Sequence, residues 1–352
     1  MKTIEAISNG RVNLIGEHTD YNDGWVLPTA IPQATRVRLT PREDMMVIGR
    51  TALRGGDERY EIGSERARAV WIDYVQGATK ILHEEGHPIK GFEIEVASTV
   101  PTGSGLSSSA ALEVATLKAL REAYALKLDD PELARIGQRI ENEFVGARVG
   151  IMDQMACALA RFGEALFLDT KSLEFERIKI PMDELGLIVI NSGVVHSNSG
   201  GDYNTRRAEC EKACAQLGIP SLRHTSIEEV ESSRNLGPTE KKRARHVVTE
   251  NARVHAAVAA LKKGDLATLG RLFYESHASM RDDYAVSVQE IDLLVELCRE
   301  QTGVFGARLT GGGFGGSIVA LAEKGRGGAV AREVVARYGA KVSTRATILV
   351  SE

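Results

Sequence analysis

The chain has 352 residues, of which 43% are hydrophobic and 26% are charged, and its formal net charge is -4. This composition is ordinary for a folded globular protein and excludes a disordered chain, while the length predicts two domains or lobes. Because there is no basic excess, no cysteine-rich framework and no apolar run of membrane-spanning length, we expect no nucleic-acid partner and no membrane partner.

The chain begins with a strand pattern that leads into a polar loop. Residues 1–6 lack the apolar region of a signal peptide, so we expect a cytoplasmic protein. Residues 11–15 alternate like a strand, and residues 16–24, the polar loop, are rich in turn-forming side chains. Further strands are expected at 25–27 and 34–39.

Several charged or polar side chains gather in and just before this loop: Arg11, Glu17, His18 and Asp20. Such residues are common in solvated hairpin loops. They are also what a polyol-binding site needs, because each hydroxyl group requires an oriented donor or acceptor. Both interpretations stay open on this segment alone.

A glycine- and serine-rich turn follows further along the chain. Residues 101–111, the glycine-serine turn, lie between a strand pattern at 91–97 and a helix pattern from 107 onward. Glycines allow close backbone approach, and the N–H groups at a helix start favour an anion. However, the turn lacks the lysine of the Walker A motif, and taken alone such a turn is more often a capped helix start than a phosphate site.

The next two predicted helices contain acidic residues, one of which is a candidate general base. An aspartate and proline pair at 129–131 predicts the start of a helix that runs through Glu143. Asp153 lies among apolar neighbours near the start of another helix. Asp153 is either a carboxylate that the helix dipole stabilises or a partly buried general base, and this stretch alone favours the first interpretation.

The second half of the chain changes to a mainly helical pattern without an intervening linker. We therefore expect an N-terminal lobe at 1–185 and a C-terminal lobe at 186–352, the latter mainly helical from residue 203 to 301. The glycine run at 311–316 matches Gly-x-Gly-x-x-Gly, but a strand pattern at 317–321 follows it instead of a helix. This excludes a dinucleotide fingerprint and predicts a close approach of another backbone or a ligand.

Five segments together resemble the GHMP small-molecule kinases, and within them the galactokinase family. The matching segments are 10–22 (the galactokinase signature), 101–110 (the phosphate motif), 309–316 (the third motif), 150–154 and 202–207. They follow the family's order along the chain. The resemblance implies an α+β, two-lobed GHMP kinase fold with mixed and antiparallel sheets, and an active site in the interdomain cleft.

The resemblance also implies an activity, the phosphorylation of galactose by ATP at the anomeric hydroxyl, with Mg²⁺. Asp153 would be the base or the orienting group at that hydroxyl, and Arg11 would lower the hydroxyl's pKa or stabilise the transferring phosphoryl group. The implied binding residues are Glu17, His18, Asp20, Gly150 and Tyr203 for galactose, Gly103, Ser104, Gly105, Leu106, Ser107, Ser108 and Ser109 for ATP, and Ser109 and Glu141 for the metal.

Three classes of function are weighed against each other. The first is a sugar kinase for galactose or for a relative such as N-acetylgalactosamine, since the loop at 194–201 departs from the usual family pattern. The second is a silent sugar sensor, which predicts a damaged phosphate motif, yet residues 107–110 and Asp153 are intact. The third is an oxidoreductase, which needs an acidic residue at the end of a second strand, where this chain has a helix pattern. We expect a small-molecule sugar as partner and a monomer or weak oligomer.

Overall fold

The computed structural model describes residues 2–51, 54–194 and 199–351, which form two compact units. The first unit comprises residues 1–11, 30–102 and 106–160, and the second comprises 12–29, 103–105 and 161–352. Neither unit is continuous, because β1 (Ile4–Asn13) and β3 (Pro28–Pro41) contribute residues to both. The division into lobes at 185/186 is a single cut in the sequence and stays a prediction.

The first unit contains a mixed sheet. In it β3 pairs with β6 in antiparallel fashion, β6 pairs with β4 in parallel, and β4 pairs with β5 in antiparallel fashion. The alternation of buried and exposed side chains along β6 explains why one face is apolar, while the other carries exposed ion pairs such as Arg38–Glu95. The bounds are β4 Met46–Thr51, β5 Arg54–Glu61 and β6 Phe92–Ser98.

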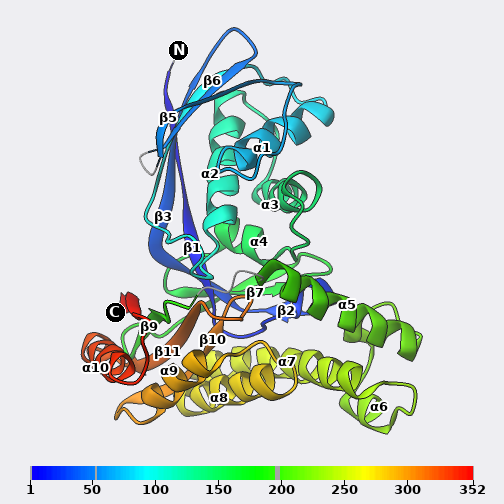
Figure 1. The fold of residues 1–352 in the computed structure, drawn as a ribbon, viewed down its shortest axis with the longest axis vertical. Helices are drawn as coiled ribbons and strands as arrows, with labels where there is room; N and C mark the ends of the chain where they lie inside the picture. Colours follow the sequence, from blue (N-terminus) through cyan, green and yellow to red (C-terminus); the bar gives the residue numbers. More distant parts are fainter. Residues whose placement is uncertain (1, 52–53, 195–198, 352) are drawn as a thin grey trace. The chain divides into compact units, whose positions relative to one another are not determined.

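Helices of the first unit lie on one side of this sheet (Figure 1). They are α1 (Asp73–Glu84), α2 (Ser108–Ala123), α3 (Asp130–Arg139) and α4 (Met152–Leu159). Leu117 and Leu120 of α2 join Ile94 of the sheet in one buried cluster.

The helix expected through Glu143 needs a correction. A capping box between Asp129 and Glu132 starts α3 as expected, but the α-helical hydrogen bonding ends at Arg139. The chain continues as a π-helix, η2 (Ile140–Val145), and leaves it at Gly146 in a left-handed conformation. A π-helical turn shifts the side chains that follow it around the helix axis, and such turns are frequent at functional sites.

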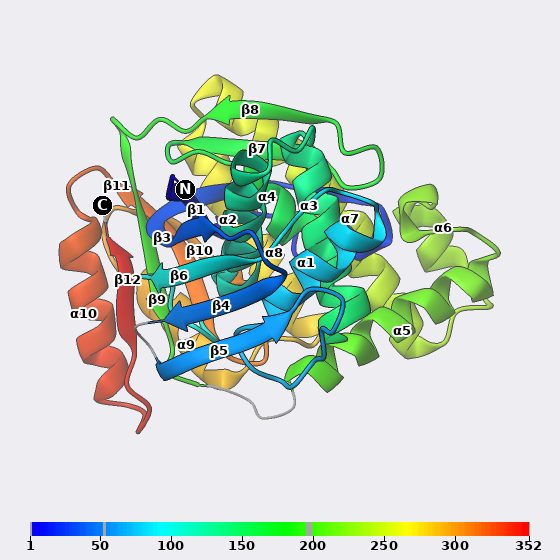
Figure 2. The same ribbon diagram turned by 90° about the horizontal axis from the view of Figure 1, so that it is seen from above.

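The second unit contains an antiparallel sheet in the order β10-β11-β9-β12. Its strands are β9 (Leu185–Asn191), β10 (Val304–Thr310), β11 (Ser317–Glu323) and β12 (Thr347–Ser351). Figure 2 shows α10 (Gly327–Gly339) lying along β12. The strand expected directly after the glycine run is confirmed as β11.

Five further α-helices occur in the described residues of the second unit, and the long helices α7 and α8 pack side by side (Figure 1). They are α5 (Ser199–Leu217), α6 (Ile227–Ser232), α7 (Pro238–Lys263), α8 (Leu266–Asp282) and α9 (Gln289–Arg299). A smaller ladder is formed by β2 (Trp25–Val26), β7 (Glu164–Asp169) and β8 (Phe175–Lys179). No helix in the described residues is long and apolar enough to span a bilayer.

Candidate active site

Within the glycine-serine turn, a strained serine lies directly before α2. Ser107 has φ 61° and ψ 49°, a left-handed conformation that costs a residue with a side chain on the order of 1 kcal/mol. Its hydroxyl is buried, does not cap the helix and forms no hydrogen bond with the residues that the structure describes. A helix start with an unused buried hydroxyl fits an anion ligand better than a self-contained capped turn.

Two buried carboxyl groups, those of Glu141 and Glu113, lie close to each other, and Glu141 is hydrogen-bonded to Ser109. Burial raises the pKa of Glu141 on η2, while a hydrogen bond from Ser109 acts in the opposite direction. Burial and the nearby Glu141 raise the pKa of Glu113 well above its usual value. Gln154 Nε2 donates to Glu113 Oε2 over 3.2 Å, so α2 and α4 are joined by a buried hydrogen bond.

Ser109 and Glu141 offer oxygen ligands of the kind that Mg²⁺ prefers. Among the described residues there is no group of three or more acidic, histidine or cysteine side chains placed to hold a metal. This still fits Mg²⁺, because Mg²⁺ is usually held by one or two protein oxygens together with water and substrate phosphates. The donor set therefore suits a metal that arrives with a nucleotide.

Asp153 and Arg11 form an ion pair, although they are 142 positions apart in the chain. Arg11 Nε and Nη2 donate to Asp153 Oδ1 over 2.8 and 2.5 Å. The Arg11 side chain is 5% exposed, whereas that of Asp153 is 32% exposed. The carboxylate lies in the first turn of α4, so it is anchored on one side and open to a ligand on the other. Gly150, which is also buried, lies three residues before it.

The polar loop of the second unit holds Glu17 and His18 in buried positions. Glu17 Oε1 accepts hydrogen bonds from the Gly311 backbone N–H over 2.8 Å and from the Thr310 hydroxyl over 3.2 Å. Burial, followed by repulsion from His246 and Arg206, lowers the pKa of His18 to about 3, so its imidazole is neutral near pH 7.

Aromatic side chains surround His18. Its Nδ1 is 2.9 Å from the Tyr21 hydroxyl, and the Tyr203 ring centroid lies 5.5 Å away from that of His18. Asp20 begins the 3-10 helix η1 (Asp20–Asn22) in the same loop and is half-buried. Glu17, His18, Asp20 and Tyr203 thus occur together in the second unit.

Sequence reasoning missed Tyr284. This buried residue shares a hydrogen bond of 2.7 Å with Tyr21 and one of 3.1 Å with Cys210, and its ring centroid is 4.7 Å from that of His18. Tyr21 and Tyr284 are 263 positions apart, and no motif surrounds Tyr284. Only the folded structure could associate it with the polar loop.

The glycine run supports the part of the glycine-serine turn that belongs to the second unit. Ser317 donates its hydroxyl hydrogen to Ser104 O over 2.7 Å. A Cβ atom at Gly311, where φ is +86°, would lie 3.1 Å from Gly105 O. The expected close approach of another backbone is therefore confirmed, and it explains why a side chain is excluded at Gly311.

The predicted site residues thus fall into two sets. The first unit brings together Arg11, Asp153, Ser109 and Glu141, with Gly150 and Leu106–Ser108 on the adjoining segments. The second unit holds the polar-loop residues with Tyr203, and Gly103–Gly105 beside the glycine run. The part of the divergent loop at 195–198 lies outside the described residues.

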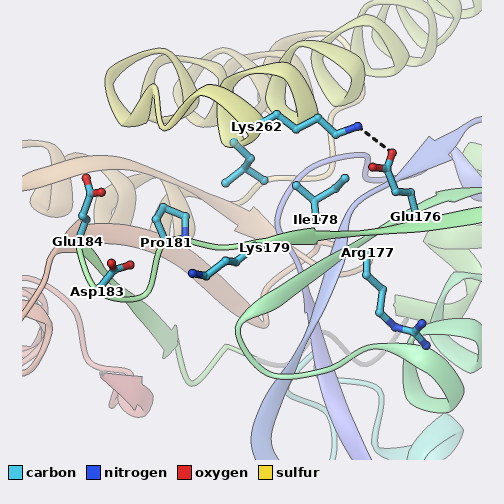
Figure 3. Close-up of a pocket in the computed structure, with 9 residues that line it drawn as sticks. Glu176, Arg177, Ile178, Lys179, Pro181, Asp183, Glu184 and Lys262 are labelled. Carbon is cyan, nitrogen blue, oxygen red and sulfur yellow. Dashed lines mark hydrogen bonds and ion pairs between the residues drawn. The ribbon is translucent and has the colours of Figure 1, made fainter.

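A shallow pocket of about 430 Å³ lies elsewhere in the second unit and holds none of the predicted site residues (Figure 3). Lys262 of α7 pairs with Glu176 of β8 over 2.8 Å at its rim. The negative charges of Asp183 and Glu184 are balanced by the positive charges of Lys179 and Arg177, so the lining has no dominant charge to select a ligand. We assign no function to this pocket.

Three sequence profiles match the chain. They are the GHMP kinases N terminal domain at 73–161, the galactokinase galactose-binding signature at 3–41 and the GHMP kinases C terminal domain at 257–341. The galactokinase of Thermotoga petrophila is 40% identical over 94% of this chain and 92% of its own length. That of Streptomyces coelicolor is 44% identical, over 94% of this chain and 87% of its own length.

Solved structures agree with these matches. The crystal structure of Lactococcus lactis galactokinase complexed with galactose has a TM-score of 0.95 and 35% identity, and the alignment covers 100% of this chain and 93% of that one. Methanococcus jannaschii mevalonate kinase has a TM-score of 0.68 at 17% identity over 99% of this chain and 98% of that one, which is a likeness of fold alone.

Proposed function

Because the chain belongs to the galactokinase family of the GHMP kinases, we propose that it transfers the γ-phosphoryl group of ATP to the anomeric hydroxyl of galactose. Its fold, with helices and with mixed and antiparallel sheets, is the GHMP kinase fold expected from the sequence. The observation that carries the proposal is the Arg11–Asp153 ion pair, in the unit that also contains Ser107–Ser109. The products are galactose 1-phosphate and ADP.

Asp153 accepts or orients the anomeric proton in this proposal. The oxygen of that hydroxyl attacks the γ-phosphorus, the bond to the β-phosphate oxygen breaks, and the proton passes to the carboxylate or to solvent. Phosphoryl transfer depends more on positioning and charge stabilisation than on a strong base. A carboxylate anchored by Arg11 over 2.5 and 2.8 Å suits an orienting role, and the guanidinium adds positive charge beside the reacting oxygens.

The glycine-serine turn binds the phosphates of ATP. The backbone N–H groups at the start of α2 and the buried Ser107 hydroxyl are suited to binding an anion, and Ser108 belongs to the same helix start. Ser109 and Glu141 would hold Mg²⁺, which when bound neutralises charge on the β- and γ-phosphates. Placement of the active site in an interdomain cleft stays a prediction.

The polar loop and Tyr203 of the second unit bind the sugar in this proposal, and Gly150 of the first unit stays a predicted sugar-binding residue. The ring of a neutral His18 has one nitrogen engaged by Tyr21, and the other nitrogen donates to or accepts from a hydroxyl group according to the tautomer. Asp20 is half-buried, which lets its carboxylate accept from sugar hydroxyls without losing all contact with water. A related sugar such as N-acetylgalactosamine is the alternative substrate. The cytoplasmic location and the monomeric or weakly associating state stay predictions.

A coupled assay of ADP release across a panel of sugars tests the proposal. We expect galactose-dependent turnover by the wild type and its loss in Asp153→Asn and Arg11→Ala. The matched control is Asp130→Asn, which breaks the 2.8 Å ion pair with Arg121 in the same unit and should leave turnover intact. Preferred turnover of N-acetylgalactosamine would change the substrate, and galactose binding without any ADP release would favour a sugar sensor.

A further inference from the structure

The polar loop contacts a group of charged side chains in which Arg308 and Glu250 are completely buried. We propose that Arg308 and Glu250 are positioning residues, which hold the backbone of residues 13–17 in the conformation that binds the sugar. The inference rests on the proposed function, because it assigns the sugar site to the polar loop. All the residues concerned belong to the second unit.

Arg308, on β10, is the largest side chain in the described part of the protein that is completely buried. Its Nη1 donates to the carbonyl oxygens of Asn13 and Leu14 over 3.0 and 2.9 Å, and its Nε donates to the Ser276 hydroxyl over 3.2 Å. One planar guanidinium therefore fixes two successive peptide groups just before the polar loop.

Glu250, on α7, holds the next peptide group. Its Oε1 accepts from the Gly16 backbone N–H over 2.9 Å and from the Ser276 hydroxyl over 2.7 Å. Gly16 has φ +102°, and a Cβ atom there would lie 2.7 Å from Trp25 O. The chain turns sharply at this glycine, so the hydrogen bond from its N–H selects one of several conformations that glycine allows.

Glu17 belongs to the same group of buried charged side chains. Arg308 Nη2 lies 3.6 Å from Glu17 Oε1 and 3.9 Å from Glu250 Oε1, and Arg253 Nε donates to Glu250 Oε2 over 2.7 Å. Two arginines thus balance two carboxylates. Opposing the effect of burial, Arg253, His246 and Arg308 lower the pKa of Glu250 to about 2, so it is charged near pH 7.

A buried charge group is a poor way to gain stability alone, because well-packed apolar side chains do as well or better. Its advantage is directional, since each hydrogen bond fixes one atom of the loop. The backbones of Asn13, Leu14 and Gly16 are held by hydrogen bonds in this way, directly before His18 and Asp20. The Glu17 carboxylate is held by the ion pair with Arg308 at 3.6 Å. The group therefore acts on the placement of sugar-binding residues.

The test compares the Michaelis constants for the two substrates. Arg308→Lys keeps the positive charge, but a single ammonium group lacks the guanidinium geometry that reaches both carbonyls and Ser276. Ser276→Ala is a milder change that removes the hydroxyl between Arg308 and Glu250. We expect the galactose KM and the calorimetric galactose Kd to rise by about tenfold in Arg308→Lys and by about threefold in Ser276→Ala, with the ATP KM within about twofold of wild type.

Val295→Ala is the matched control, because it opens a cavity in the buried core at α9 and removes none of the hydrogen bonds of Arg308 or Glu250. It should lower Tm while leaving the galactose KM unchanged. An unchanged galactose KM in folded Arg308→Lys and Ser276→Ala would overturn the inference, as would equal rises in both Michaelis constants. Absence of galactose turnover in the wild type would instead refute the proposed function.

Discussion

The Asp153→Asn variant offers the sharpest separation of chemistry from stability. Asparagine keeps the size of the side chain and one oxygen that can accept from Arg11, but it removes the negative charge. The two hydrogen bonds of 2.8 and 2.5 Å from Arg11 then end on a neutral amide instead of a carboxylate. Arg11, 5% exposed, loses the countercharge of that pair, while position 153 remains accessible to water.

The structural cost of this change can be bounded. Removing one partner of a buried pair costs about 3–5 kcal/mol, but the Asp153 side chain is 32% exposed, so screening brings the expected loss down to about 1–3 kcal/mol. Proteins of this kind are stable by about 5–15 kcal/mol, so the variant stays more than about 90% folded at 25 °C. Unfolding therefore explains only a small part of any large loss of rate.

The expected loss of rate is much larger. A group that moves or orients the proton in the transition state contributes on the order of 10²–10⁴-fold, and kcat should fall by that factor. We would measure kcat by coupled ADP release, stability by urea unfolding and galactose affinity by calorimetry, with Asp130→Asn beside it. A kcat within tenfold of wild type in a folded variant that binds both substrates would refute the role given to Asp153.

Three further predictions concern the buried ionisable groups and the metal. Burial lowers the pKa of His246 to about 4, so the folded state resists protonation of this histidine and the protein loses stability as pH falls from about 6.5 to 4. His246→Gln should reduce the slope of unfolding free energy against pH in this window by up to about 1.4 kcal/mol per pH unit, as measured by urea unfolding. Equal slopes for the wild type and the variant would count against this prediction. Burial raises the pKa of Glu113, so the stability that its protonated form contributes is lost as pH rises. The difference in stability between Glu113→Gln and the wild type should therefore be more favourable to the variant at pH 8 than at pH 5, in buffer containing a chelator. Chelation of divalent ions should abolish turnover, and Glu141→Gln should raise the Mg²⁺ concentration for half-maximal rate by at least about tenfold, whereas an unchanged requirement would remove Glu141 from the metal site.

Local patterns in the sequence predict most of the elements and the positions of the motifs on them. The start of α2 directly after Ser107 and the place of Asp153 in the first turn of α4 are confirmed, because apolar periodicity acts within a few residues. β5 was not expected, since Arg54–Glu61 is dominated by charged residues and glycines and has little strand propensity. α10 and β12 were also not expected.

Residues that act over long sequence separations could not be found in this way. Tyr284 lies in no motif and Arg308 lies just outside the third motif, and their roles come from partners 263 and 294 positions away. Nothing in a periodic pattern specifies which distant peptide group a buried guanidinium will meet. The change from α3 to a π-helix at Ile140 was missed because helix propensity does not distinguish α-helical from π-helical hydrogen bonding.

The long separation between the polar loop and its anchor also has a consequence for biosynthesis. Leu14 leaves the ribosome 294 residues before Arg308, and at about 5–20 residues per second this interval lasts on the order of 15–60 s. During that time the carbonyl groups of Asn13 and Leu14 have no native guanidinium to receive them. The nascent chain therefore carries an incompletely anchored polar loop until β10 has been made.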